Sequence, residues 1–179
     1  MIPVLETERL ILREYRLEDF PFHVAMSGDP ATMQAISDNF RAFDEEQCWL
    51  RFLRNIGIWQ LFGYGWWGLE EKITGHYVGT VGFFQGRRAI DNIPYRDAPE
   101  AAWMLAPDRR GKGLASEALQ AAMAWCDANI AASETWCMIA TKNIASQKTA
   151  ERFGYRPAAN ALYKGEEMLT FLRQRGGQA

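Results

Sequence analysis

The stretch from Ala106 to Leu119 constrains the fold more than any other part of the sequence. It reads A-P-D-R-R-G-K-G-L-A-S-E-A-L, so a turn opened by Pro107 leads through two glycines directly into a helical pattern. That pattern consists of apolar residues at spacings of three and four, at positions 114, 118, 121, 122 and 125. The stretch therefore predicts the end of a strand, a glycine-rich loop and a helix N-terminus, in that order.

A junction of this kind can bind an anion. The first N–H groups of a helix have no internal partner and together carry roughly half a positive charge, so a pyrophosphate can bind there. Gly111 and Gly113 would let the backbone approach such a ligand, and side chains that could add contacts are Arg109, Arg110, Lys112 and Ser116. An ordinary exposed turn has the same composition, so on these residues alone both interpretations stay open.

Three segments resemble a known family. R-R-G-K-G-L-A at a helix start resembles the acetyl-CoA signature of the GNAT N-acetyltransferases, in which this loop wraps the pyrophosphate. T-E-R-L-I-L-R at residues 7–13, followed by Asp19, resembles the opening of the RimJ/RimL-like branch, which contains the bacterial ribosomal-protein N-terminal acetyltransferases. The third match is N-x-x-S at Asn143 and Ser146. One position departs from the family: Asp108 stands where Gln or Arg is usual, which would weaken a side-chain phosphate contact.

The resemblance implies a mixed α/β fold of the GNAT acyl-CoA N-acyltransferase type. Its central twisted sheet would be mostly antiparallel, with about seven strands, flanking helices and a splayed parallel pair at the cofactor site. A backbone N–H between Met104 and Ala106 would bind the oxyanion, and Asn143 would bond the pantetheine arm. The implied cofactor-binding residues are Met104, Leu105, Ala106, Arg109, Arg110, Gly111, Lys112, Gly113, Leu114, Ala115, Ser116 and Asn143.

Two residues are candidates for catalysis. Glu100 stands before the apolar residues 101–105, where partial desolvation would raise the pKa of its carboxyl and suit it to act as a base. Its position also resembles that of a glutamate in this branch, although a solvent-facing strand end is the alternative. The resemblance places Ser146 near the sulfur, where many GNAT enzymes instead use a tyrosine that is replaced here by Ala150. A simple helix N-cap is the other interpretation of Ser146, as an Asx-turn is of Asn143.

Composition limits the class of protein. The 179 residues suit a single domain, residues 1–179, and 48% hydrophobic residues argue against disorder. A net charge of −2 gives no general case for nucleic-acid binding, and no apolar run reaches the length of a membrane span. The N-terminus lacks the pattern of a secretory signal, and three scattered cysteines suit reduced thiols, so we expect a cytoplasmic protein. His23 and His76 lack the neighbours that a triad or a metal site requires.

The pattern of the chain predicts the remaining elements. Strands are predicted at 5–14, 65–71, 76–85, 100–105, 135–141, 155–162 and 168–173, the one at 135–141 parallel to that at 100–105. Helices are predicted as two short ones within 18–36, then at 44–60, at 114–129 and from 143 to 153. Arg9 and Arg13 should lie on a solvated strand face, and the helix at 44–60 should bury Trp49, Phe52, Leu53, Ile56 and Trp59. The loop at 86–99 should form a wall of the substrate site, and 175–179 should fray.

A second glycine motif is rejected as a dinucleotide site. Residues 63–68 match G-x-G-x-x-G, but a helix precedes them, two tryptophans fill them and a strand follows.

These patterns together indicate an N-acetyltransferase that uses acetyl-CoA as co-substrate, acts by direct attack of a neutral amine and needs no metal. The acceptor is either a protein N-terminal amine or a small amine such as a polyamine, an amino acid or an aminoglycoside. A CoA-binding module without turnover is the alternative from another class. The protein could be a monomer or a homodimer.

Overall fold

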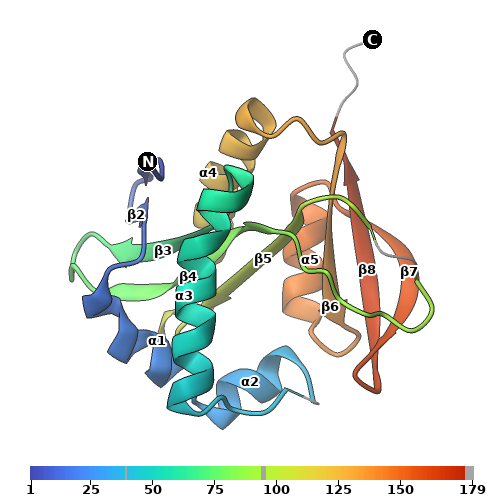
Figure 1. Ribbon diagram of the computed structural model, residues 1–179, viewed down its shortest axis with the longest axis horizontal. Coiled ribbons are helices and arrows are strands. Elements are labelled where there is room, and N and C mark those ends of the chain that lie inside the picture. The colour runs from blue at the N-terminus through green and yellow to red at the C-terminus, as the bar shows by residue number, and fades with distance from the viewer. Residues whose placement is uncertain (39, 94–95, 176–179) are drawn as a thin grey trace.

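The computed structural model of the chain describes residues 1–38, 40–93 and 96–175 (Figure 1). Its helices are η1 (Leu17–Asp19), α1 (Phe20–Ser27), α2 (Pro30–Ile36), α3 (Glu45–Phe62), η2 (Pro107–Arg109), α4 (Leu114–Asn129) and α5 (Ile144–Arg152). Its strands are β1 (Leu5–Glu6), β2 (Leu10–Arg13), β3 (Trp66–Glu71), β4 (Tyr77–Phe84), β5 (Glu100–Leu105), β6 (Glu134–Ala140), β7 (Arg156–Tyr163) and β8 (Glu166–Gln174).

The strands form one sheet in the order β1-β2-β3-β4-β5-β6-β8-β7. Of the strand pairs in the described ranges, β5 with β6 is parallel and the others are antiparallel. The predicted mixed α/β fold with one parallel pair is therefore confirmed. The described residues form eight strands rather than about seven, because the first predicted strand is divided in two.

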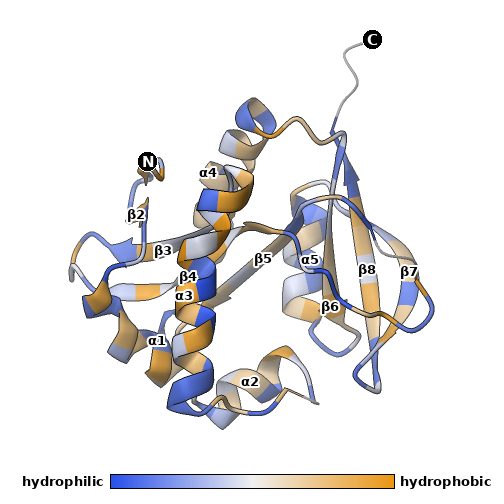
Figure 2. Ribbon diagram, in the orientation of Figure 1, coloured by the Kyte–Doolittle hydropathy of each residue, from blue (hydrophilic) through white to orange (hydrophobic). Residues whose placement is uncertain are grey.

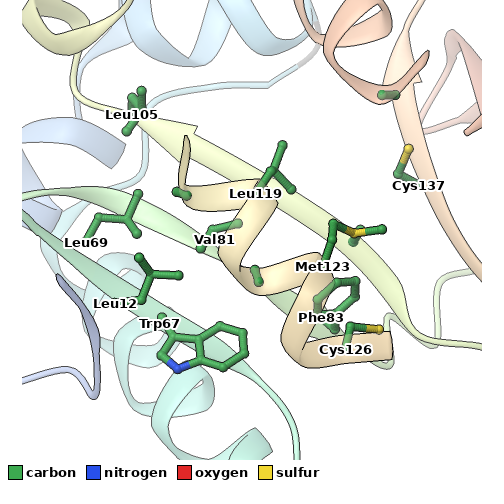
Figure 3. Packing of buried hydrophobic residues seen from close by; sticks show 14 of the residues in the cluster. Leu12, Trp67, Leu69, Val81, Phe83, Leu105, Leu119, Met123, Cys126 and Cys137 are labelled. Atoms are coloured by element: carbon green, nitrogen blue, oxygen red, sulfur yellow. The ribbon is translucent and has the colours of Figure 1, made fainter. Parts of the chain in front are cut away.

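Helices cover both faces of the sheet. Ala101 and Leu105 of β5 pack in the large core under α4, which Figure 3 shows with Leu119 and Met123 lying over Val81 and Phe83. The alternate β5 residues Ala102 and Met104 pack against a second cluster, which includes Phe52 of α3. This alternation follows from the period of two along a strand. As a result, α4 and α3 lie on opposite faces of β5.

Local signals fix the ends of the helices. Asp44 caps α3 and forms a capping box with Gln47, and Gly63 ends the helix in the left-handed conformation. The rejected glycine motif thus turns the chain from α3 into β3, as predicted. Gly79 approaches the backbone of β5 so closely that a side chain there would overlap the carbonyl oxygen of Met104.

The prediction of one strand at 5–14 is wrong. A turn at residues 7–9 separates β1 from β2, and the two short strands pair with each other. The Thr7 side chain makes this turn, because its hydroxyl accepts a hydrogen bond from Leu10 N–H (2.9 Å). The same hydroxyl contacts the carboxylate of Glu117 on α4, 110 residues away. A partner so distant in sequence cannot be read from the local pattern.

The prediction of a solvated face is also wrong for Arg13. Its residue surface is 3% exposed, and its guanidinium binds both oxygens of buried Asp19 (2.7 and 2.8 Å) and one oxygen of Glu70 (2.5 Å). Arg9 lies in the turn and is half exposed, bonded to Glu117 and to the Lys112 carbonyl oxygen.

The C-terminal tail was predicted to fray from residue 175. Arg175 is instead held in place, because its side chain bonds the Ala132 carbonyl oxygen. Residues 176–179 lie outside the described part.

Replacing Arg13 tests the buried ion pair. We expect Arg13→Gln to lower the free energy of unfolding by roughly 3 kcal/mol or more, because it leaves the Asp19 carboxylate buried without its cation. Arg16→Gln is the matched control, since Arg16 also pairs with Glu70 (3.2 Å) but is exposed; its cost should stay below about 1 kcal/mol. Urea unfolding of both variants gives the comparison, and equal losses would contradict this account of the pair.

His23 lies in the core between helix α1 and the sheet. It is 2% exposed, its Nδ1 lies 3.5 Å from the Tyr77 hydroxyl, and its buried Nε2 has no hydrogen-bond partner among the described residues. Burial, with smaller contributions from the charges of Arg51 and Arg54, lowers the pKa of His23 from 6.5 to about 4. His23 is therefore neutral in the fold.

This histidine predicts sensitivity to acid. As the pH falls, His23 takes up a proton in the unfolded chain before it does so in the fold. The free energy of unfolding should therefore decrease as the pH falls from 6.5 toward about 4. The slope from this group is at most about 1.4 kcal/mol per pH unit. His23→Phe should flatten the dependence, measured by urea unfolding at several pH values, whereas His76→Phe at an exposed position should not. An unchanged slope in His23→Phe would refute the assignment.

Candidate active site

Strands β5 and β6 separate soon after they meet. β5 pairs with β4 over six residue positions, and β6 pairs with β8 over seven. Between β5 and β6 the register contains the single pair Glu100 and Trp136, and Figure 1 shows the two strands moving apart beyond it. The backbone edge of β5 after Glu100 thus faces a gap instead of a neighbouring strand.

The register of the strands indicates which backbone N–H group points into this gap and could bind the oxyanion. The Ala106 N–H bonds the Val78 carbonyl oxygen (2.9 Å), so it is already used. Alternate residues of an antiparallel strand direct their N–H groups to opposite sides, which turns that of Met104 toward β4 as well. Of the three residues predicted to contain an oxyanion donor, Leu105 directs its N–H toward the gap.

The glycine-rich loop ends with backbone groups that point away from the protein's own acceptors. In the part of the chain that the structure describes, the N–H groups of residues 111–116 make no hydrogen bond, whereas that of Arg110 bonds Pro107 O (3.3 Å). Gly111 and Gly113 have φ angles of 73° and 79°, a region that favours glycine. Gly113 directly precedes the first residue of α4. The N-terminus of α4 therefore has the unbonded amides that an anion site requires.

Several side chains predicted to bind the cofactor are engaged within the protein. Arg109 pairs with Glu71 (3.2 Å) and with Asp108, the residue that departs from the family pattern. Arg110 bonds the Leu105 carbonyl oxygen (3.1 Å), and the Ser116 hydroxyl accepts a hydrogen bond from Arg152 (2.9 Å). Lys112 is exposed on the loop. In this structure the backbone, more than these side chains, is available to an anion.

The start of α5 brings the third matched segment to the site. Asn143 is the N-cap, because its Oδ1 accepts a hydrogen bond from Ser146 N–H (3.1 Å). Ser146 lies in the first turn and is not the cap, so that interpretation of its role is wrong. Gly154 follows the last turn with φ 85°, as expected of a helix C-terminus.

A cavity of about 490 Å³ lies beside β5 and the start of α5. It brings together Glu100, Met104, Asn143 and Ser146, four of the predicted site residues, from β5 and α5. Gly86 and Arg88 contribute from the loop at 86–99, which therefore forms part of the cavity wall, while Tyr95 lies outside the described residues. That this wall belongs to the substrate site stays a prediction. Leu105, Ala106 and residues 109–116 are not among the described lining residues, so the glycine loop lies outside this cavity.

Glu100 is buried at the start of β5 and paired. The residue is 2% exposed, and Arg88 binds both carboxylate oxygens at 3.0 and 2.9 Å. Burial raises the pKa of Glu100 above its ordinary value, and the charges of Arg88 and Arg54 oppose that rise. Arg88 itself lies 5.4 and 5.3 Å from the ring centres of Phe84 and Tyr163. The expected partly desolvated carboxyl is thus present, together with a cation that sequence analysis did not assign to it.

Helix α3 contributes a polar stripe that sequence analysis missed. Gln47, Arg51, Arg54 and Asn55 line the cavity, at positions separated by four, three and one residues. This spacing places them on one face of a helix, which was a readable signal. The predicted apolar stripe is correct for Phe52 and Trp59, but Trp49 and Leu53 are exposed. Figure 2 shows hydrophilic and hydrophobic residues mixed along α3.

The described residues offer neither a metal site nor a membrane-spanning helix. Among the described residues there is no group of three or more His, Cys, Asp and Glu placed to hold a metal ion. Within the same ranges, no helix combines the length and the apolar character needed to cross a membrane.

Comparison with known proteins identifies the family. The model of the "Acetyltransferase (GNAT) domain" matches residues 9–156, and the chain therefore belongs to the GNAT acetyltransferase family. The uncharacterized N-acetyltransferase YoaA of Bacillus subtilis is 24% identical over 161 residues, covering 87% of this chain and 84% of YoaA. A GNAT-family acetyltransferase from Bordetella pertussis, itself assigned only by family, has 32% identity and a TM-score of 0.82, covering 96% of this chain and 99% of that one.

RimL, a ribosomal-protein alpha-N-acetyltransferase solved in complex with coenzyme A, has the same fold. Its TM-score is 0.75 at 19% identity, and the match covers 96% of this chain and 98% of RimL. The predicted family is confirmed, and a RimL structure is among the structural neighbours.

Proposed function

We propose that this protein transfers an acetyl group from acetyl-CoA to a primary amine, by direct attack of the amine within a ternary complex. The separation of β5 and β6 is the observation that supports this most strongly. It opens the sheet between the helix N-terminus with unbonded amides and the cavity that contains Glu100. A protein N-terminal amine and a small-molecule amine are both compatible with this arrangement.

The residues present fit acetyl-CoA. Its pyrophosphate would bind the N–H groups of residues 111–116 at the start of α4, where the helix dipole also favours negative charge. Lys112 would add a cation, and Asn143, which lines the cavity, would contact the pantetheine arm. Asp108, which stands where the family usually has Gln or Arg, would add no side-chain contact to the pyrophosphate. Binding mainly by the backbone N–H groups does not require that contact.

The chain offers the groups that acetyl transfer requires. Acetyl-CoA supplies the activated acyl group as a thioester. An alkylammonium with a pKa near ~10 must lose a proton before it can attack, and Glu100 would accept that proton, directly or through water. The Leu105 N–H would stabilise the negative charge on the acyl oxygen, and Ser146 would donate a hydrogen bond to the departing thiolate. Ala150 cannot supply the tyrosine acid used by many relatives.

Isothermal titration tests cofactor binding. Wild-type protein should bind acetyl-CoA saturably, and no binding at high micromolar concentration would refute the proposal. Gly113→Ala should weaken binding about tenfold or more, because a side chain at φ 79° strains the loop whose amides bind the pyrophosphate. Gly75→Ala is the control, since Gly75 has φ 68° in a turn outside the site and should leave the dissociation constant unchanged.

Glu100→Gln tests the base. The amide cannot accept the ammonium proton, so turnover should fall about 100-fold or more while acetyl-CoA affinity stays unchanged. Free-thiol release over a panel of amines measures the rate, and titration calorimetry measures the affinity. Unchanged turnover would refute the role of Glu100. A wild-type protein that binds acetyl-CoA but releases no thiol with any amine would instead favour the module without turnover.

A further inference from the structure

The cavity is strongly positive. The described residues that line it include Arg41, Arg51, Arg54, Arg88 and Lys164, but Glu100 is the one carboxylate among them. Arg88 is matched by Glu100, to which it is bonded through two nitrogens. Among the described residues no carboxylate lies within 4.0 Å of Arg41, Arg51 or Arg54, so these three form an excess of positive charge. Such an excess disfavours a polycationic acceptor and favours one that carries negative charge.

Arg51 and Arg54 are the best placed of these cations. They lie three residues apart on α3, and within the described ranges no carboxylate oxygen lies within 4.0 Å of either guanidinium. Arg51 packs 4.3 Å from the centre of the Phe43 ring, and Arg54 donates to the Asn55 side-chain oxygen (3.2 Å). Burial and the charges of Arg54 and Arg88 lower the pKa of Arg51 to about 10, which still leaves it charged at neutral pH. Two adjacent like charges are therefore held at the cavity, and no carboxylate of the described residues is in direct contact with either of them.

These charges are separate from the proposed pyrophosphate site. That site lies at the N-terminus of α4, and the described residues lining the cavity include none of residues 109–116. The helices α3 and α4 also cover opposite faces of β5. The pyrophosphate thus does not account for the charge on α3.

We propose that Arg51 and Arg54 bind an anionic group of the acceptor, a carboxylate or a phosphate, while the acceptor's amine lies at Glu100. This inference rests on the proposed function and names the acceptor class as amines that carry a nearby negative charge. Guanidinium groups suit both anions, because each presents several N–H donors in one plane. The Glu100 carboxylate, at the same cavity, is the group that would attract the cationic amine before its deprotonation.

The anionic group has two possible sources. It can belong to a small molecule, such as an amino acid or an amino phosphate, or to an acidic residue that follows the N-terminal amine of a peptide. Both sources present the same chemistry to α3. The test therefore needs one arm for each.

Free-thiol release with matched amines is the first experiment. The small-molecule pairs are β-alanine with propylamine and O-phosphoethanolamine with ethanolamine; the peptide set is Ser-Glu-Glu, Ser-Gln-Gln and Ser-Lys-Lys, each with an amidated C-terminus. In at least one arm, the anionic member should exceed its neutral partner about tenfold or more in kcat/KM. Equal or better rates for the neutral or cationic members in both arms would overturn the proposal.

Binding is the second readout, and it does not depend on turnover. The same probes are titrated into protein saturated with CoA, which lacks an acetyl group. The anionic probe of the favoured arm should bind, and Arg51→Gln and Arg54→Gln should each raise its dissociation constant about tenfold. Arg51→Lys should recover part of the loss. Arg156→Gln removes an exposed charge outside the cavity and should have no effect.

The outcomes separate the two proposals. Unchanged acetyl-CoA affinity in the Arg51 and Arg54 variants shows that they are folded. The anion site is refuted if the Arg51 and Arg54 variants bind the anionic probe as tightly as Arg156→Gln does, or if the wild type binds neutral probes as tightly as anionic ones. Neither result would contradict acetyl transfer. Failure of acetyl-CoA to bind the wild type would refute the proposed function, and the titrations, repeated without CoA, would still report whether Arg51 and Arg54 bind an anionic amine.

Discussion

The single pair between Glu100 and Trp136 is the constraint on which the rest of the structure depends. Trp136 holds the junction, because its backbone N–H bonds the Pro99 carbonyl oxygen (3.1 Å) and its indole bonds that of Ala98 (3.0 Å). Beyond this point β5 keeps β4 as a neighbour and β6 keeps β8, so each strand is paired on one edge. Backbone N–H groups that are buried without hydrogen-bond partners destabilise a fold. A ligand that supplies acceptors for these groups would offset that loss of stability. The sheet is thus continuous in topology but open at the position where chemistry is proposed.

The opening connects two faces with different properties. On one face, the N-terminus of α4 presents backbone amides, and Arg9 supports the loop by bonding both Glu117 of α4 and the Lys112 carbonyl oxygen. On the other face, α3 and the loop at 86–99 surround Glu100 with arginines. A thioester between the strands would meet the cofactor-binding face and the acceptor-binding face at once. The two proposed substrates therefore need not compete for the same cations.

Local sequence signals predicted the elements well and their long-range contacts poorly. The junction into α4, the cap at Asp44 and the glycine after α5 depend on neighbouring residues, so their patterns were sufficient. Arg13 is buried with two partners, Asp19 six positions away and Glu70 57 positions away across the sheet, and an arginine in a strand gives no sign of a partner as distant as Glu70. Arg88 likewise meets Glu100 only because the long loop returns to the start of β5. Residue type alone could not distinguish these paired cations from solvated ones.

Helix α3 shows why a site built on a core element is difficult to find. Its apolar residues suggest core packing, yet its cavity face is formed by the polar residues between them, with Asn55 buried and bonded to the Tyr15 hydroxyl (3.2 Å). That face also acts on the proposed base, because the charge of Arg54, together with that of Arg88 from the loop at 86–99, opposes the rise that burial causes in the pKa of Glu100. An anion bound at Arg54 would cancel part of this opposition and so raise the proton affinity of Glu100. An acceptor with negative charge would thereby strengthen the base that its own amine requires.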